Sequence, residues 1–170
     1  MEKGWDHDPP AKNKLVPLGI LVMATGMLSL FFGNHETSDF WVDCLKAWWE
    51  KVRSKHRGLR RLVIYLDNGP KNSGSRTQFL KRMVEFADWF GLEIRLVYYP
   101  PYHSKYNPIE RCWSSLQKKW NGVLLRCWQV VEACANRMTW KGIHPDVHRI
   151  AKEYPNGVRV SRREMKPINA

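Results

Sequence analysis

Apolar runs and helically spaced apolar positions divide the chain into alternating strands and helices. Residues 15–32 contain no charged side chain, and the Ala24-Thr25-Gly26 turn signal divides them into two expected strands, 15–23 and 27–32. The pattern that follows predicts a helix at 40–53, a strand at 62–66, a helix at 76–90, a strand at 92–99, and helices at 107–119 and 129–138. This order predicts one α/β domain.

The uncharged stretch at residues 15–32 just reaches the length at which a membrane helix must be considered. Pro17, Gly19 and the central turn signal favour two buried strands instead. We therefore expect no membrane association, and we retain a small membrane-anchored protein as the weakest alternative.

The charge of the chain indicates a polyanionic partner. The formal net charge is +12, and cationic proteins gain affinity for nucleic acid by releasing its counterions. Residues 51–61 contain no acid and are either a DNA-contacting segment or a solvated face. The basic candidates for DNA contact in this segment are Lys51, Arg53, Lys55, Arg57, Arg60 and Arg61. The four cysteines have no zinc-ligand spacing, which favours a reducing, cytoplasmic location.

Two carboxylates occupy positions that suit a metal site. Asp67 directly follows the apolar strand at 62–66, and Glu110 lies in a helix that begins near Asn107 and Pro108. Carboxylates are preferred ligands of Mg²⁺ and Mn²⁺, and two such ions can activate and stabilise phosphodiester chemistry. Two acids alone make a weak site for two ions, because a third carboxylate is normally needed. A strand-end Asp and a helical Glu also occur for purely structural reasons.

Two motifs resemble one family of enzymes. The residues YLDNG at 65–69 and PPYHSKYNPIERCW at 100–113 are similar to the second and third acidic motifs of bacterial insertion-sequence transposases of the DDE class, in the groups related to mariner elements. The resemblance extends from about residue 15 to residue 138. It implies a ribonuclease H-like fold, a mixed sheet flanked by helices. It also implies Mg²⁺-dependent (or Mn²⁺-dependent) cleavage of transposon ends with two ions, followed by strand transfer into target DNA.

The resemblance assigns roles to individual residues. Asp67 and Glu110 correspond to catalytic metal ligands, and Ser104, Lys105 and Asn107 lie beside the site as candidates for DNA contact. Of these, Lys105 is the best candidate for contact with a phosphate.

The chain also departs from the family pattern. The family's first catalytic aspartate lies on the first, central strand, but only a loop-like segment, residues 1–14, precedes residue 15. We therefore expect the carboxyl-terminal portion of a transposase, lacking that strand and inactive alone. Its expected partners are DNA, the missing amino-terminal half and further copies of itself. The expected divisions are a lead-in at 1–14, a partial catalytic domain at 15–140 and a basic peripheral tail at 141–170. Open strand edges predict marginal solubility, and a non-catalytic DNA-binding remnant is the main alternative.

Overall fold

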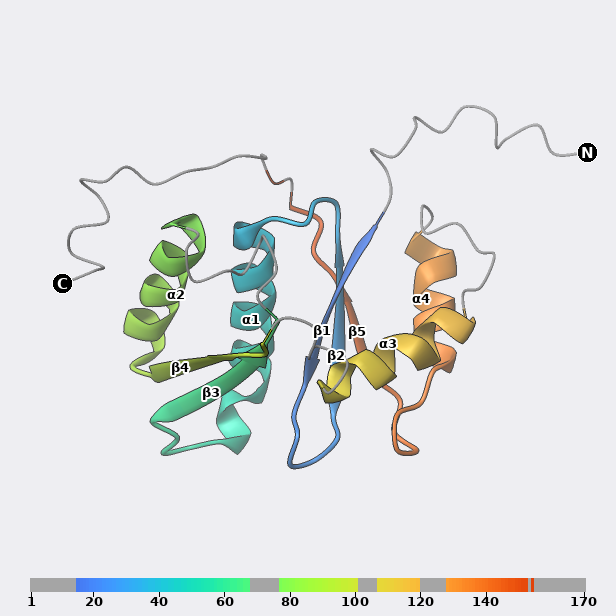
Figure 1. Cartoon of the computed structure of the whole chain (residues 1–170). Helices are drawn as coiled ribbons and strands as arrows, with labels where there is room; N and C mark the ends of the chain where they lie inside the picture. Colours follow the sequence, from blue (N-terminus) through green and yellow to red (C-terminus); the bar gives the residue numbers. More distant parts are fainter. Residues whose placement is uncertain (1–14, 68–76, 101–106, 120–127, 153, 155–170) are drawn as a thin grey trace, which may run out of the picture.

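A computed structural model describes residues 15–67, 77–100, 107–119, 128–152 and 154 of the chain (Figure 1). The expected elements at residues 15–138 are all present, with ends that differ from the expected ones by a few residues. In chain order the elements are β1 (Val16–Leu21), β2 (Leu28–Gly33), α1 (Ser38–Val52), the short 3₁₀ helix η1 (Arg53–Lys55), β3 (Arg61–Leu66), α2 (Thr77–Phe90), β4 (Glu93–Tyr98), α3 (Pro108–Lys119), α4 (Trp128–Arg137) and β5 (Asp146–Arg149).

The strands form two separate sheets. One has the order β1-β2-β5, with β1 antiparallel and β5 parallel to β2. The other consists of β3 and β4, which run parallel. Helices α1 and α2 lie on one side of the molecule, and α3 and α4 lie on the other (Figure 1). The architecture is therefore α/β with mixed strand directions, which is compatible with a ribonuclease H-like fold.

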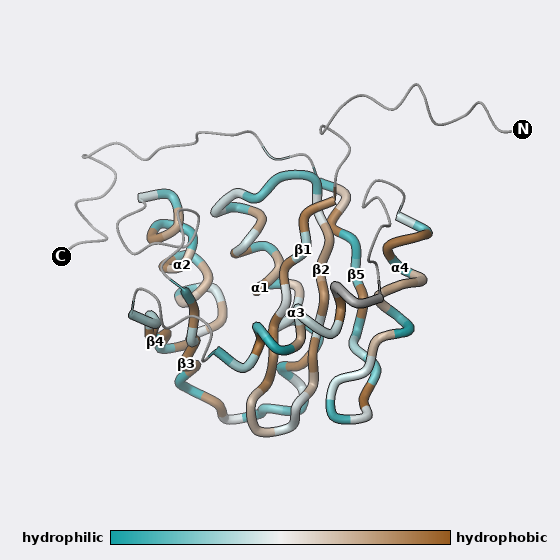
Figure 2. The backbone as a smooth tube through the Cα atoms, turned by 45° about the vertical axis from the view of Figure 1, so that its right-hand side comes forward, coloured by the Kyte–Doolittle hydropathy of each residue, from teal (hydrophilic) through white to brown (hydrophobic). Residues whose placement is uncertain are grey.

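The uncharged stretch at residues 15–32 forms a hairpin. Gly26 adopts a left-handed conformation (φ 75°) at the turn, and the Val22 N–H donates to the Met27 carbonyl over 2.9 Å. All six residues of β2 are buried, and β1 and β2 form the apolar centre of the molecule (Figure 2). The prediction of two strands is confirmed, and no helix among the described residues is long and apolar enough to cross a membrane.

Helix α1 begins at a side-chain cap and buries a broad apolar face. The Thr37 hydroxyl accepts a hydrogen bond from the Phe40 N–H at 3.1 Å, which satisfies a donor that the helix itself leaves unpaired. Trp48 and Trp49 are both buried and pack in the core. This face belongs to a core cluster that also includes Phe31 from β2 and Leu66 from β3.

The second core lies on the opposite face of the β1-β2 hairpin. Because side chains alternate along a strand, Leu30 and Phe32 point away from α1 and pack with Leu116 of α3 and Val131 of α4. This packing fixes α3 against the first sheet.

The segment expected to be a peripheral tail contributes a strand. Asp146–Arg149 pair with β2, and the Ile150 N–H donates to the Phe32 carbonyl at 2.8 Å. Val147 packs against the second core, and Tyr154 is buried. For these residues the expectation was wrong, because pairing with β2 compensates for their weak apolar pattern. Residues 1–14 and 155–170 lie outside the described part of the chain.

A network of charged side chains joins α1, α2 and Tyr154. Arg82 donates to Asp39 at 2.8 Å and also to Asp43, and the Tyr154 hydroxyl donates to Asp43 at 2.8 Å. Burial alone raises the pKa of Asp43, but the hydrogen bonds from Arg82 and Tyr154 outweigh it and hold that pKa below its ordinary value. The ionised form of Asp43 therefore stabilises the fold.

This network predicts a loss of stability in acid. A depressed carboxyl pKa contributes stability that is present above the unfolded-state pKa, about 3.9, and is lost as the pH falls through the folded-state value. We expect the free energy of unfolding, measured by urea denaturation, to decrease below about pH 5, and to decrease less steeply in Asp43→Asn. Asp88→Asn, at an exposed position on α2, is the control. An equally steep decrease in Asp43→Asn would contradict the assignment.

Candidate active site

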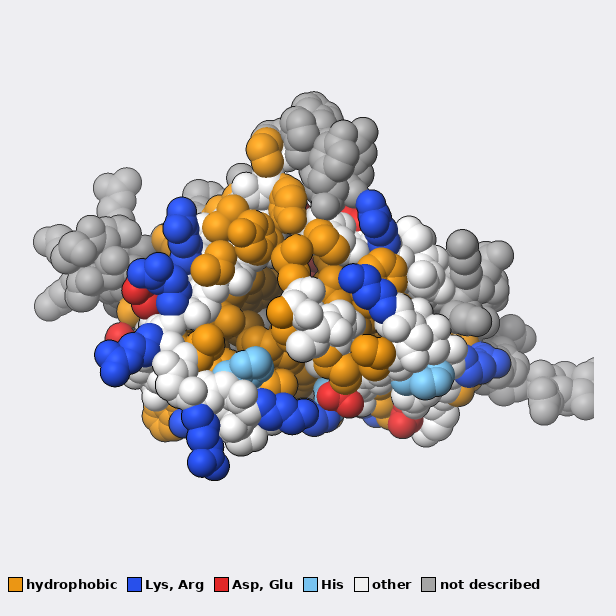
Figure 3. Space-filling view, turned by 90° about the horizontal axis from the view of Figure 1, so that it is seen from below, with side chains coloured by type: hydrophobic (Ala, Val, Ile, Leu, Met, Phe, Trp, Pro, Cys, Tyr) orange, Lys and Arg blue, Asp and Glu red, His pale blue; other side chains and the backbone are white. Residues whose placement is uncertain are grey.

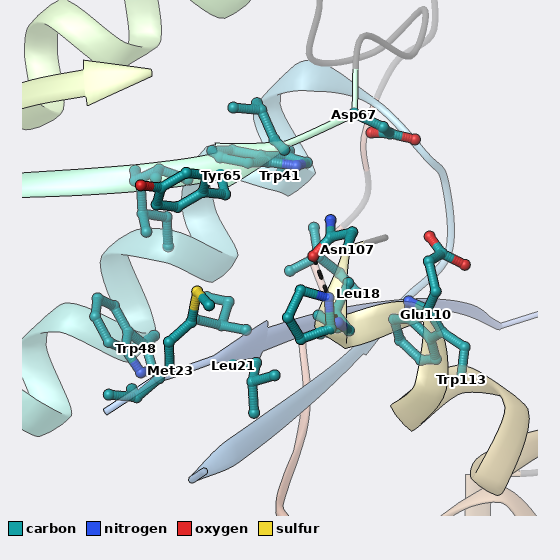
Figure 4. A pocket seen from close by; sticks show the side chains of 18 of the residues that line it. Leu18, Leu21, Met23, Trp41, Trp48, Tyr65, Asp67, Asn107, Glu110 and Trp113 are labelled. Atoms are coloured by element: carbon teal, nitrogen blue, oxygen red, sulfur yellow. Dashed lines mark hydrogen bonds between the residues drawn. The ribbon is translucent and has the colours of Figure 1, made fainter. Parts of the chain in front are cut away.

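A cleft separates the two sheets. Its cavity of about 500 Å³ is lined by β1 and β3, by Trp41, Leu45 and Trp48 of α1, and by the first turns of α3. Seen from below, apolar side chains gather around a hollow in the middle of the molecule (Figure 3). Asp67 and Glu110 lie at one end of this cleft, and Met23 and Trp48 lie at the other (Figure 4).

Asp67 and Glu110 are held by different elements, β3 and α3. Asp67 follows the last residue of β3, Leu66, whose buried side chain anchors that strand to the core. Glu110 lies in the first turn of α3, where the Asn107 side-chain oxygen accepts a hydrogen bond from the Ile109 N–H at 3.4 Å. This long capping contact and Pro108 define where the helix begins.

A close contact with β1 also positions α3. A Cβ atom at Gly19 would lie 3.0 Å from the Trp113 ring and 3.1 Å from the Ile109 side chain. Glycine at this position therefore lets the α3 side chains rest directly on the backbone of β1. In the sequence, Gly19 indicated only that residues 15–32 form two strands and not one membrane helix. Trp113 had no individual predicted role.

Glu110 lies in an environment that disfavours its ionised form. Burial raises the pKa of Glu110, and the negative charge of Asp67 raises it further. Both carboxylates point into the same end of the cleft (Figure 4). A cation bound between them would remove this repulsion.

The donor set suits a hard divalent cation but is incomplete. Carboxylate oxygens are the ligands that Mg²⁺ and Mn²⁺ prefer. Glu36 lines the same cavity, yet no group of three His, Cys, Asp or Glu residues within the described ranges could hold a metal ion. Asp67 and Glu110 therefore fit such a site as two of its ligands.

Of the other predicted site residues, only some line the cavity. Asn107 lines the cavity beside Glu110, whereas Ser104 and Lys105 lie outside the described residues. None of the six basic candidates from residues 51–61 lines the cavity. Three of them contact other side chains: Lys51 pairs with Asp146 at 3.2 Å, Arg61 pairs with Glu93 at 3.0 Å, and Arg53 lies over the Phe90 ring. The remaining three, Lys55, Arg57 and Arg60, are exposed.

Sequence reasoning missed the aromatic lining of the cleft. The sequence predicts a helix at residues 40–53 and a strand at 62–66, but no role for their aromatic side chains in a cleft. In the structure the Trp41, Trp48 and Tyr65 side chains surround the space between the sheets (Figure 4). The spacing of the apolar residues in α1 predicts that one face of this helix is buried. It does not predict that both sheets pack against that face.

The repulsion between the two acids can be measured directly. We expect Asp67→Asn to lower the pKa of Glu110, because it removes the negative charge but leaves the burial unchanged. NMR titration of the Glu110 carboxyl carbon would report the shift, with exposed Asp88→Asn as the control. An unchanged Glu110 pKa in Asp67→Asn would show that the two carboxylates do not share a site.

Comparison with known families agrees with this geometry. No curated protein matches the chain. The model of the family described as the Rhodopirellula transposase DDE domain matches residues 2–170, nearly the full length of the sequence. The chain therefore belongs to this family of insertion-sequence DDE transposase domains.

Proposed function

We propose that this chain forms part of a catalytic domain that cleaves DNA and transfers strands with the help of divalent metal ions. The observation that carries the proposal is the position of Asp67 and Glu110 at one end of the cleft, where burial and the charge of Asp67 both raise the pKa of Glu110. Membership of a DDE transposase family supports DNA as the substrate.

The roles of the residues follow from the chemistry of phosphodiesters. Asp67 and Glu110 would hold the divalent ions, which would supply charge neutralisation for phosphodiester chemistry. Asn107 caps α3 and so fixes the direction from which Glu110 enters the site. Ser104 and Lys105, on the segment before α3, are proposed to contact the DNA backbone, with Lys105 on a phosphate.

We further propose that the chain alone is inactive. The described residues provide Asp67 and Glu110 but no third acid close enough to complete a metal site. The first catalytic aspartate is proposed to come from the amino-terminal half of the transposase or to be lost. Two Mg²⁺ or Mn²⁺ ions are proposed for the complete site.

Substitution of the two acids tests the catalytic proposal. In the complete transposase that contains this chain, we expect Asp67→Ala and Glu110→Ala each to reduce Mg²⁺-dependent strand transfer by at least about 100-fold, because each removes a ligand of the ions. Asp88→Ala, on the exposed face of α2, is the matched acidic control and should retain activity.

The same assay distinguishes the second candidate function. A non-catalytic DNA-binding remnant is favoured by the net charge of +12 together with the incomplete set of carboxylates. Equal residual activity in wild type, Asp67→Ala and Glu110→Ala would support that remnant and contradict the catalytic role.

DNA binding by the basic segment has its own test. Lys55, Arg57 and Arg60 are exposed, so we expect each substitution by Ala to lower the slope of log affinity against log salt concentration by about 1. Lys51→Ala is the control, because Lys51 is already paired with Asp146 and should change the slope less. Fluorescence anisotropy with duplex DNA at several salt concentrations measures both. An unchanged slope in the Lys55, Arg57 and Arg60 variants would show that the segment is a solvated face.

A further inference from the structure

One face of the β3-β4 sheet lies outside both hydrophobic cores of the described chain. Leu62, Ile64 and Leu96 point their side chains toward the core cluster that α1 and α2 share. Because side chains alternate along a strand, the residues between them point to the other side of the sheet, which we call the open face. The open face consists of Arg61, Val63 and Tyr65 of β3, Glu93, Arg95 and Val97 of β4, and the adjoining Tyr99. None of these residues belongs to either core cluster of the described part of the chain, so this face is available to a partner.

The chemistry of the open face changes along its length. At the start of β3, the Arg61 and Glu93 side chains form an ion pair over 3.0 Å and cancel each other's charge. Val63 and Arg95 are the next pair along the same face, and both are exposed. Tyr65 follows near the carboxyl end of the strand. The open face is thus charged at one end and aromatic at the end that adjoins the candidate active site.

The Tyr65 ring is exposed and held in place by a neighbour. The Tyr65 side chain is 50% exposed, and the centroid of its ring lies 6.2 Å from that of the Tyr99 ring. The two ring planes are inclined by 46°, so they do not stack face to face. An aromatic neighbour at this distance restricts where the Tyr65 ring can lie and adds apolar contact. Tyr65 therefore presents a flat apolar surface to solvent in a defined position.

Tyr65 lies close to both candidate metal ligands. It precedes Asp67 by two residues, which corresponds to about 6.6 Å along a strand. Tyr65, Asp67 and Glu110 all line the cleft, and Figure 4 shows them around the same space. Consecutive nucleotides in one strand of duplex DNA are about 3.4 Å apart along the axis. A DNA strand that follows β3 from a phosphate between the two acids therefore passes Tyr65 within about two nucleotides.

We propose that Tyr65 stacks on an unpaired base of the DNA strand that enters the candidate active site. This inference rests on the proposed function, under which a phosphate of that strand lies between Asp67 and Glu110. An aromatic ring binds the flat face of a base, and such contacts tolerate different sequences because every base has this face. The faces of bases inside a duplex are already stacked on their neighbours, so the partner of Tyr65 is a base that has left the duplex. Tyr65 is thus assigned as a substrate-binding residue beside the two acids.

The charge of the open face favours a base over a phosphate as the partner of Tyr65. The face has two Arg residues, and these are balanced by Glu93 and by Asp67 at its end, so it has no formal net charge. The overall charge of +12 therefore comes from other parts of the chain. Attraction of phosphates needs uncompensated cations, whereas stacking needs only the ring and its apolar surroundings.

The surroundings of Tyr65 favour DNA over a protein as the partner. The open face adjoins the end of the cleft that holds Asp67 and Glu110. A protein seated on Tyr65 would occupy the space that a substrate strand needs to reach these acids. The occupant that is compatible with the proposed function is therefore the substrate itself.

Binding of two oligonucleotides by the full chain tests the proposal. One is a fluorescent single strand of about eight thymidines, and the other has the same backbone with abasic residues in place of the bases. In the presence of Mg²⁺, we expect Tyr65→Leu to weaken binding of the thymidine strand about 5-fold to 100-fold, because it removes a stacking contact. Binding of the abasic strand should change by less than about twofold, since it offers no base to stack. Tyr65→Phe keeps the ring and should bind both strands like the wild type.

Trp89→Leu is the matched aromatic control. Trp89 of α2 is 73% exposed but is not among the described residues that line the cleft. Its substitution should leave the affinity for both strands unchanged. An equal loss of affinity for the thymidine strand in Trp89→Leu would show that any exposed ring on this chain adheres to bases, and would overturn the assignment to Tyr65.

An NMR measurement on the wild-type chain keeps the test decisive even if Tyr65→Leu does not fold. The ring proton signals of Tyr65 can be assigned by their absence in Tyr65→Phe. We expect these signals to shift when the thymidine strand is added, because a stacked base changes the magnetic environment of the ring. They should stay in place when the abasic strand is added. Signals that respond equally to both strands would contradict stacking.

The remaining outcomes are distinct. Equal weakening of both strands in Tyr65→Leu, or unchanged binding of the thymidine strand, would overturn the proposal. So would a wild-type chain that binds the abasic strand as tightly as the thymidine strand. A dimer of the chain that Tyr65→Leu dissociates, measured by analytical ultracentrifugation, would assign the open face to a second copy and overturn the choice of DNA.

Failure of this inference can be distinguished from failure of the proposed function. The oligonucleotide assay needs no catalysis, whereas the proposed function is tested by strand transfer in Asp67→Ala and Glu110→Ala. If these two variants retain strand transfer while Tyr65→Leu still distinguishes the two strands, the proposed function fails and base binding at Tyr65 stands. If they lose strand transfer while Tyr65→Leu binds both strands like the wild type, the stacking fails and the proposed function stands.

Discussion

The arrangement of the two sheets depends on the packing of both against the apolar face of α1. No backbone pairing among the described residues joins the β1-β2-β5 sheet to the β3-β4 sheet. Both sheets instead pack side chains into one core cluster with α1, Phe31 from the first sheet and Leu66 from the second. Side-chain packing is not directional in the way that a strand ladder is. The spacing between the sheets is therefore set by the side chains of one helix.

The packing of both sheets against α1 also affects the candidate active site. Asp67 belongs to the second sheet, whereas Glu110 lies on α3, which packs on the first sheet through the close contact of Trp113 with Gly19. The separation of the two carboxylates thus depends on how the sheets sit against α1.

Most elements could be predicted from the sequence because their signals are local. The uncharged residues 15–32 with a central turn predict a hairpin, and the spacing of Trp41, Leu45 and Trp48 predicts the buried face of α1. Strand β5 could not be predicted in this way. Asp146, His148 and Arg149 give it no apolar alternation, and it exists because β2, distant in sequence, offers a free edge. The site was located through its motifs, but the cleft beside it depends on which strands remain unpaired.

The two carboxylates at one end of the cleft impose an electrostatic cost on that site. Burial raises the pKa of Glu110, and repulsion from the Asp67 carboxylate raises it further. Proton uptake by Glu110 relieves this repulsion, and a bound divalent ion relieves it more completely because both acids then stay ionised.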